Sequence, residues 1–133
     1  HFGKAAIRQH VPRFQCSLEY LETHSSLLYY MTTLGVSVHT PEEAARAEKL
    51  GATYIMASHV FPTDCKKTMP PIGTQTVQAI CDAVSIPVYA LGGINLQTVK
   101  ELGTTPVAGV ALMSGLMVCH DVPAYVRELK QQH

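Results

Sequence analysis

Residues 34–57 have the sequence LGVSVHTPEEAARAEKLGATYIMA, in which the spacing of the apolar residues changes twice. Both ends of this stretch are short apolar runs of the kind that form strands. Between them, Thr40 precedes Pro41 and stands three residues before Glu43, which is typical of a capped helix start. Alanine and leucine then recur at helical spacing until Gly51, which predicts the end of the helix. The stretch therefore predicts a strand, a helix and a second strand.

The same alternation continues to the end of the chain. Strands are predicted to begin near Leu34, Thr53, Pro87 and Gly109, and a segment with helical spacing follows each of them. Alternation of this kind indicates βαβ units and a parallel sheet covered by helices. It fits an open doubly wound sheet or part of a (β/α)8 barrel, of which a full copy needs roughly 200 residues or more. No G-x-G-x-x-G motif follows the first strand, which argues against a dinucleotide-binding fold.

Residues 1–33 have the least regular pattern. One helix is predicted to begin near Ala5 and to be interrupted by Pro12, and another is predicted to begin at Ser17. Residues 27–31 form a short apolar run that fits a strand or a helix, because period alone does not separate the two over such a length.

Composition narrows the classes of function. The chain has 133 residues, and ten basic side chains balance ten acidic ones, so neither nucleic acid nor an anionic membrane is expected as a partner. No apolar stretch is long enough to span a bilayer. The cysteines at positions 16, 65, 81 and 119 are scattered without a C-x-x-C pair. This spacing predicts neither a zinc site nor a disulfide framework, and it favours a cytoplasmic protein.

A loop rich in functional groups follows the second predicted strand. Residues 58–67, SHVFPTDCKK, combine a histidine, an aspartate, a cysteine, two lysines and a threonine. Such loops often carry binding and catalytic groups, although a polar surface turn is the alternative. An imidazole titrates near neutrality, so His59 is a candidate for proton transfer, while Lys66 is a candidate for binding an anion. His39 also ends a strand, but we expect it to make a structural hydrogen bond beside the helix cap.

Two later loops favour a phosphate site. Gly92-Gly93 and Met113-Ser114-Gly115 follow the last two predicted strands, where (β/α)8 enzymes often bind a substrate phosphate. Glycine lets backbone N–H groups approach an anion closely, and a helix N-terminus after each loop adds favourable partial charge. We expect a phosphate to bind these loops, with Lys66 as a further contact.

Taken together, four segments resemble one superfamily, that of thiamin phosphate synthase and the thiazole tautomerase of thiamin biosynthesis. The segments are residues 35–40, 59–67, 86–94 and 109–115. The resemblance implies the C-terminal portion of a (β/α)8 TIM barrel, with about four βα units and truncation at the N-terminus. It implies a single partial-barrel domain over residues 1–133, within which 34–133 match well. His1-Phe2-Gly3 resembles the end of the family's fourth strand.

Two positions within this resemblance favour the tautomerase. The synthases usually carry Gly-Pro where this chain has Ser58-His59, whereas the tautomerases carry a histidine there. The synthases also place a magnesium-binding aspartate where this chain has Lys4-Ala5-Ala6. We therefore predict an isomerase that converts a carboxylated dihydrothiazole phosphate to the aromatic thiazole carboxylate phosphate. The alternatives are a synthase, which joins a pyrimidine pyrophosphate to a thiazole phosphate, and a non-catalytic phosphate-binding remnant.

The resemblance also implies the roles of individual residues. His59 is the catalytic proton-transfer residue, and the phosphate is expected on Gly93, Met113 and Ser114. The remaining substrate contacts are expected from Ser37, Thr63, Asp64, Cys65 and Lys66. No metal and no cofactor are expected, except magnesium under the synthase alternative. The expected partner is a small thiazole phosphate, without nucleic acid or membrane, in a homo-oligomer or together with a missing N-terminal half.

Overall fold

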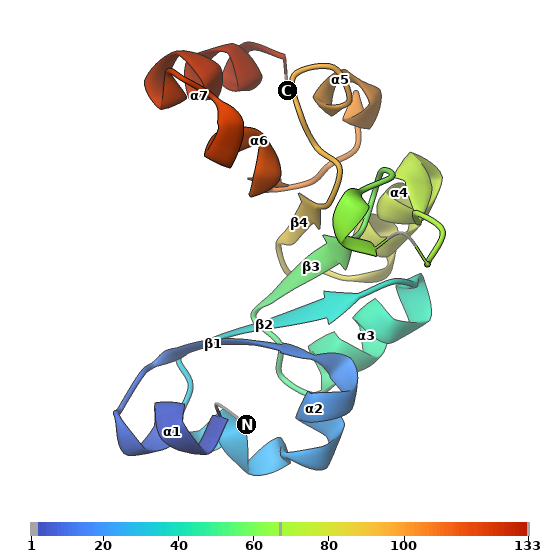
Figure 1. Cartoon of the computed structure of the whole chain (residues 1–133). Helices are drawn as coiled ribbons and strands as arrows, with labels where there is room; N and C mark the ends of the chain where they lie inside the picture. The colour runs from blue at the N-terminus through green and yellow to red at the C-terminus, as the bar shows by residue number, and fades with distance from the viewer. Residues whose placement is uncertain (1–2, 67, 133) are drawn as a thin grey trace.

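Five parallel strands form the centre of the molecule (Figure 1). The computed structural model describes residues 3–66 and 68–132. The strands lie side by side in chain order, and their bounds are β1 Arg13–Ser17, β2 Thr33–Val38, β3 Tyr54–Ser58, β4 Val88–Leu91 and β5 Gly109–Ala111. Because the order follows the chain, each connection crosses to the adjacent strand. The predicted α/β class and the four predicted strand positions are confirmed.

Helices precede, connect and follow the strands. Their bounds are α1 Gly3–Arg8, α2 Leu18–Thr23, η1 Ser25–Tyr29, α3 Pro41–Lys49, η2 Asp64–Lys66, α4 Gly73–Ala83, α5 Val99–Leu102, α6 Ser114–Val118 and α7 Val122–Gln131. Helices α3 and α4 pack beside each other against the middle of the sheet, while α1 and α7 lie at opposite ends of the structure (Figure 1). Within the described residues, no helix has the length and apolar character needed to cross a membrane.

The start of α3 follows the predicted capping pattern with one change. The Thr40 hydroxyl accepts a hydrogen bond from the backbone N–H of Glu43 at 3.2 Å. The Glu43 carboxylate, however, accepts from the backbone N–H of His39 at 2.7 Å, one residue earlier than in a capping box. The same oxygen lies 3.3 Å from Nδ1 of His39. The structural hydrogen bond expected for His39 is therefore confirmed.

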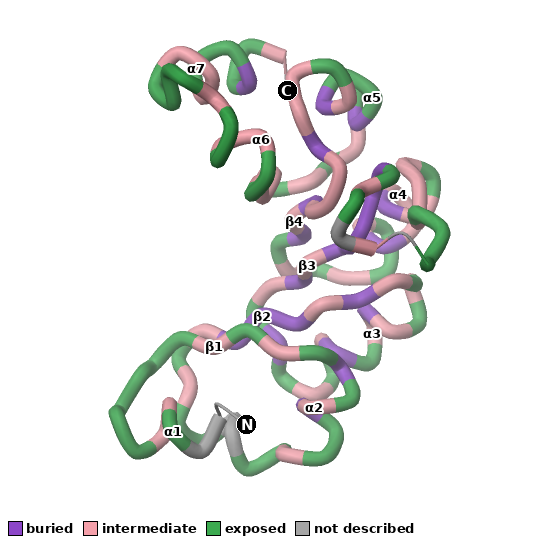
Figure 2. Tube along the Cα trace, in the orientation of Figure 1, coloured by how far each residue is buried: buried purple, intermediate pink, exposed green. Residues whose placement is uncertain are grey.

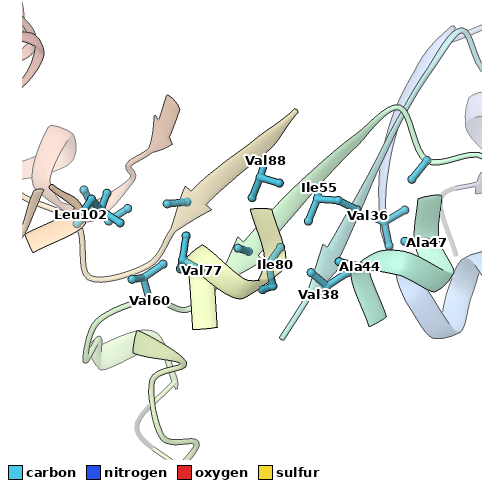
Figure 3. Packing of buried hydrophobic residues seen from close by; sticks show 14 of the residues in the cluster. Val36, Val38, Ala44, Ala47, Ile55, Val60, Val77, Ile80, Val88 and Leu102 are labelled. Carbon is cyan, nitrogen blue, oxygen red and sulfur yellow. The ribbon is translucent and has the colours of Figure 1, made fainter. Parts of the chain in front are cut away.

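The core lies between the sheet and the helices α3 and α4 (Figures 2 and 3). Alternate residues of β2 and β3 are fully buried on this side, and Val36 and Ile55 are neighbours in the sheet register. Ala44 of α3 and Ile80 of α4 pack against them. Small alanines on α3 allow the helix to approach the strands closely. Burial of these apolar groups is the main stabilising term, at roughly 25 cal/mol per Å² removed from water.

The N-terminal segment differs in part from the sequence expectation. The helices near Ala5 and Ser17 are confirmed as α1 and α2, and the Ser17 hydroxyl caps α2. Strand β1, which pairs with β2, was not predicted. Exposed and half-buried residues alternate along β1, and only Phe14 and Cys16 in it are apolar. Two apolar residues are too few to predict a strand from the sequence.

Two further expectations concern the same segment. Residues 25–29 form the 3₁₀ helix η1, not the strand or α-helix expected over 27–31. Of the three residues that resemble a strand end, His1 and Phe2 lie outside the described residues, and Gly3 begins α1 instead.

The structure describes the side chains of three cysteines. Cys16, Cys81 and Cys119 are free thiols. Burial raises the pKa of the Cys16 thiol and of the Cys81 thiol, which makes both poor nucleophiles. The side chain of Cys65 lies outside the described part of the structure.

Candidate functional site

The carboxyl ends of β3, β4 and β5 lie at one edge of the sheet, and the loops that follow them enclose a pocket. Parallel strands end on the same side, which is where barrel enzymes place their sites. The volume of the pocket is about 190 Å³. Its lining residues are Ser58, His59, Thr63, Lys66, Leu91, Gly92, Gly93, Ile94, Ala111, Leu112, Met113 and Ser114. The structure thus brings together the histidine loop and both glycine- or serine-containing loops.

His59 is held at the floor of this pocket. Only 3% of the residue is exposed. Its carbonyl accepts a hydrogen bond from the backbone N–H of Ile72 at 2.9 Å, and the next residue, Val60, donates to the carbonyl of Leu91 at 3.0 Å. A Cβ added to Gly92 would overlap the Cβ of His59, so only glycine allows this approach. The backbone of His59 is therefore fixed on both sides.

The backbone of Gly93 is also closely surrounded by its neighbours. Its φ is +67°, and an added Cβ would lie 2.6 Å from the carbonyl oxygen of Pro62 and 2.7 Å from that of Phe61. The Thr98 hydroxyl donates a hydrogen bond to the Gly93 carbonyl at 2.9 Å. The side-chain oxygen of Asn95 accepts hydrogen bonds from the N–H groups of Gln97 and Thr98. These contacts fix the backbone that faces the pocket.

The end of β5 and the residues after it line a further side of the pocket. Met113 and Ser114 line the pocket, and both are exposed. Helix α6 begins at Ser114 but has five residues, and α5 begins at Val99, well after Gly93. The expected helix N-termini therefore contribute little here, because a macrodipole needs several aligned turns. Any anion binding at these loops rests on individual N–H and hydroxyl groups.

The loop after β3 supplies polar side chains. Thr63 and Lys66 line the pocket, and the backbone N–H of Lys66 donates to the carbonyl of Thr63 at 3.2 Å. A second hollow adjoins the first and shares His59, Thr63 and Lys66 with it. Asp64 lines only this second hollow. Lys66 is the single cationic side chain that lines the first pocket within the described residues.

Among the predicted site residues, Ser37 lies apart from the pocket. It belongs to β2, and its hydroxyl accepts a hydrogen bond from Nε2 of Gln15 on β1 at 3.0 Å. Conversely, the pocket includes Ser58, which is 3% exposed and which was not predicted to be a site residue. Its position immediately before His59, at the end of a predicted strand, was the signal available.

The described residues do not fit a magnesium site. They contain no group of three or more histidine, cysteine, aspartate or glutamate side chains that could hold a metal ion. Asp64 is the only carboxylate that lines either hollow within that part of the chain. Magnesium prefers several oxygen ligands, with one or two carboxylates among them.

A family model described as thiamine monophosphate synthase matches residues 17–116. The chain belongs to this family. Among curated members, the thiamine-phosphate synthase of Pyrococcus horikoshii is 44% identical over 98 residues, which cover 74% of this chain and 47% of the relative. That of Chlorobium phaeovibrioides is 39% identical over 103 residues, which cover 74% of this chain and 49% of the relative. The chain thus spans about half the length of the curated thiamine monophosphate synthase family members that it matches.

Solved structures with a similar fold include a protein of the same family. The thiamine phosphate pyrophosphorylase of Pyrococcus furiosus superposes with a TM-score of 0.79 at 34% identity, covering 97% of this chain and 62% of that one. KGPDC from Streptococcus mutans superposes with a TM-score of 0.73 at 14% identity, covering 98% of this chain and 65% of that one. The second likeness concerns the fold alone.

The prediction of a thiazole tautomerase, and with it of an isomerase, is wrong. The curated relatives at 39–44% identity are named thiamine-phosphate synthase. The prediction depended on His59 and on the residues after Gly3, whereas the identity to the synthases extends over about a hundred residues. The broader expectation, an enzyme family of thiamin biosynthesis, is confirmed.

Proposed function

We propose that this chain forms the phosphate-binding part of a thiamine-phosphate synthase, the transferase that joins a pyrimidine pyrophosphate to a thiazole phosphate. One observation carries the proposal: a single pocket combines Lys66 with the loops at Gly93 and Ser114. A cation, hydroxyl groups and closely approaching backbone are the groups that recognise phosphate oxygens. The names of the relatives supply the reaction.

The size of the pocket limits what it binds. Small-molecule sites commonly measure about 300–1,000 Å³, whereas this pocket measures about 190 Å³. It is large enough for a phosphate group and the adjoining part of one substrate. We assign the phosphate to the backbone of Gly93, Met113 and Ser114, with Lys66 and Thr63 at its open side. The adjoining hollow, which shares Lys66, has room for further parts of the substrates.

The proposal assigns binding and positioning to these residues. Lys66 offsets the charge of the phosphate oxygens, and the fixed backbone at Gly93 holds the ester in one orientation. Because the described residues do not form a magnesium site, no metal-dependent step is assigned to them. Asp64, which lines the second hollow, and Cys65 remain predicted substrate contacts. Ser37 also remains a prediction, but it lines neither hollow and its hydroxyl accepts a hydrogen bond from Gln15.

Two measurements test the proposal. In the first, the protein is incubated with the pyrimidine pyrophosphate and the thiazole phosphate, with and without magnesium, and thiamine phosphate is quantified by chromatography. In the second, binding of the thiazole phosphate is measured by calorimetry. Binding with product formation supports the proposal, and binding without product supports the non-catalytic alternative. The absence of binding contradicts both.

A further inference from the structure

We propose that His59 contacts the bound phosphate ester as a hydrogen-bond donor through Nε2, while Nδ1 keeps its lone pair. This inference rests on the proposed function, because it adds a side-chain donor to the phosphate pocket. It gives His59 a binding role in place of proton transfer.

The first observation is the environment of the imidazole. His59 is 3% exposed, yet its Nδ1 atom is buried and has no hydrogen-bond partner among the described residues. A buried polar atom without a partner is uncommon, because leaving it unpaired destabilises the fold. Nε2 is not among the buried atoms that lack a partner, and His59 lines both hollows. We infer that the ring directs Nδ1 into the protein and Nε2 toward the ligand space.

The second observation is that the ring has little freedom to find a partner elsewhere. Backbone hydrogen bonds to Ile72 and Leu91 fix His59 and its neighbour, and Gly92 packs directly under the Cβ. The buried position of Nδ1 is thus a consequence of the backbone path between β3 and β4. A side chain held in this way is preorganised for a ligand.

These observations select one tautomer. An imidazole with one proton is a donor at one nitrogen and an acceptor at the other. A proton on Nδ1 would create a buried N–H without an acceptor, which is rare in proteins. A proton on Nε2 places the N–H where water or a phosphate oxygen can accept it. Among the described residues, Lys66 and Asp64 are the charged side chains that line the hollows beside His59, and neither is needed for this assignment.

Two substitutions distinguish the nitrogens. The amide nitrogen of glutamine takes a position close to Nε2 of histidine, whereas that of asparagine takes a position close to Nδ1. We expect His59→Gln to retain the affinity for inorganic phosphate within about threefold. His59→Asn should weaken it about tenfold or more, since a hydrogen bond to a charged group is lost. Retention in His59→Asn with loss in His59→Gln, or equal affinities in both, would overturn the proposal.

The unsubstituted protein provides a test that does not depend on folding of the variants. Long-range proton–nitrogen NMR spectra at pH 8 should show the Nε2–H tautomer of His59. Added inorganic phosphate should shift Nε2 together with the backbone amides of Gly93 and Ser114. An Nδ1–H tautomer, or amide shifts without a shift of Nε2, would overturn the inference and leave the phosphate pocket intact. If none of these signals moves, the phosphate pocket itself is wrong, and this inference with it.

Discussion

Glu48, near the end of α3, accepts two hydrogen bonds from Ser85, a residue that lies 37 positions later. Oε1 of Glu48 accepts from the backbone N–H of Ser85 at 2.9 Å and from its hydroxyl at 2.6 Å. Ser85 lies between α4 and β4, so this carboxylate joins two βα units. Because the hydrogen bonds from Ser85 favour the charged form, they hold the pKa of Glu48 below its ordinary value of 4.5.

This contact predicts a pH-dependent contribution to stability. A carboxylate whose pKa is lowered by folding stabilises the protein above its unfolded pKa, and the contribution is lost as pH falls through the folded value. Glu48→Gln should therefore lower the urea midpoint at pH 7, and the difference from the original protein should shrink below about pH 4. Denaturation at several pH values measures this, with the exposed Glu128→Gln as control. A difference that stays constant with pH would contradict the prediction.

We predict that a side chain at Gly93 disrupts the phosphate pocket. Gly93→Ala places a Cβ against two carbonyl oxygens that cannot move aside, in addition to the positive φ. Gly73→Ala is the matched control, because its φ is +74° and nothing lies within 4 Å of the added atom. The control should cost about 1–2 kcal/mol of unfolding free energy, and Gly93→Ala should cost more. Only Gly93→Ala should also abolish phosphate binding, as judged by calorimetry.

The core between sheet and helices predicts a large effect at Ile80. This side chain on α4 is fully buried against the strands. Ile80→Ala should lower the unfolding free energy by about 2–5 kcal/mol, because it removes apolar contacts and leaves a cavity. Gln75→Ala, at an exposed position of the same helix, should change it by less than about 0.5 kcal/mol. Equal effects of the two substitutions in chemical denaturation would show that α4 does not pack as described.

We predict that replacing Lys66 selectively weakens the binding of anions. Lys66→Gln removes the charge beside the phosphate loops and should weaken phosphate binding about tenfold, with little change in the thermal midpoint. Lys130→Gln, at an exposed position of α7, is the control for a general change of charge. The affinity of the original protein should fall with added salt, and that of Lys66→Gln should fall less steeply. An unchanged affinity in Lys66→Gln would place the anion elsewhere.

The exposed apolar residues around α6 predict self-association of the 133-residue chain. Met117 and Val118 are 79% and 78% exposed, and β5 is an open edge of the sheet. Apolar patches and open edges favour contacts between molecules. Sedimentation should show a dimer or larger species at micromolar concentration, and Met117→Lys should shift it toward the monomer. A cooperatively folded monomer at all concentrations would contradict the prediction.

The strands β2 to β5 and the helix α3 were predictable because their signals are local. An apolar run flanked by glycine or proline has to be buried, and Thr40 caps α3 within four residues of the chain. Strand β1 gave no such signal. Its polar residues alternate with only Phe14 and Cys16, and its conformation depends on pairing with β2 across about twenty residues of sequence.

The sequence by itself located the loops that carry His59, Gly93 and Ser114, since each follows a predicted strand. Only the tertiary structure decided that these loops enclose one pocket, because their distance depends on the lateral order of β3, β4 and β5. It also placed Ser37 on β2, outside the pocket and bonded to Gln15. Local spacing fixes which residues end a strand, whereas hydrogen bonds between strands far apart in the chain fix which of those ends meet.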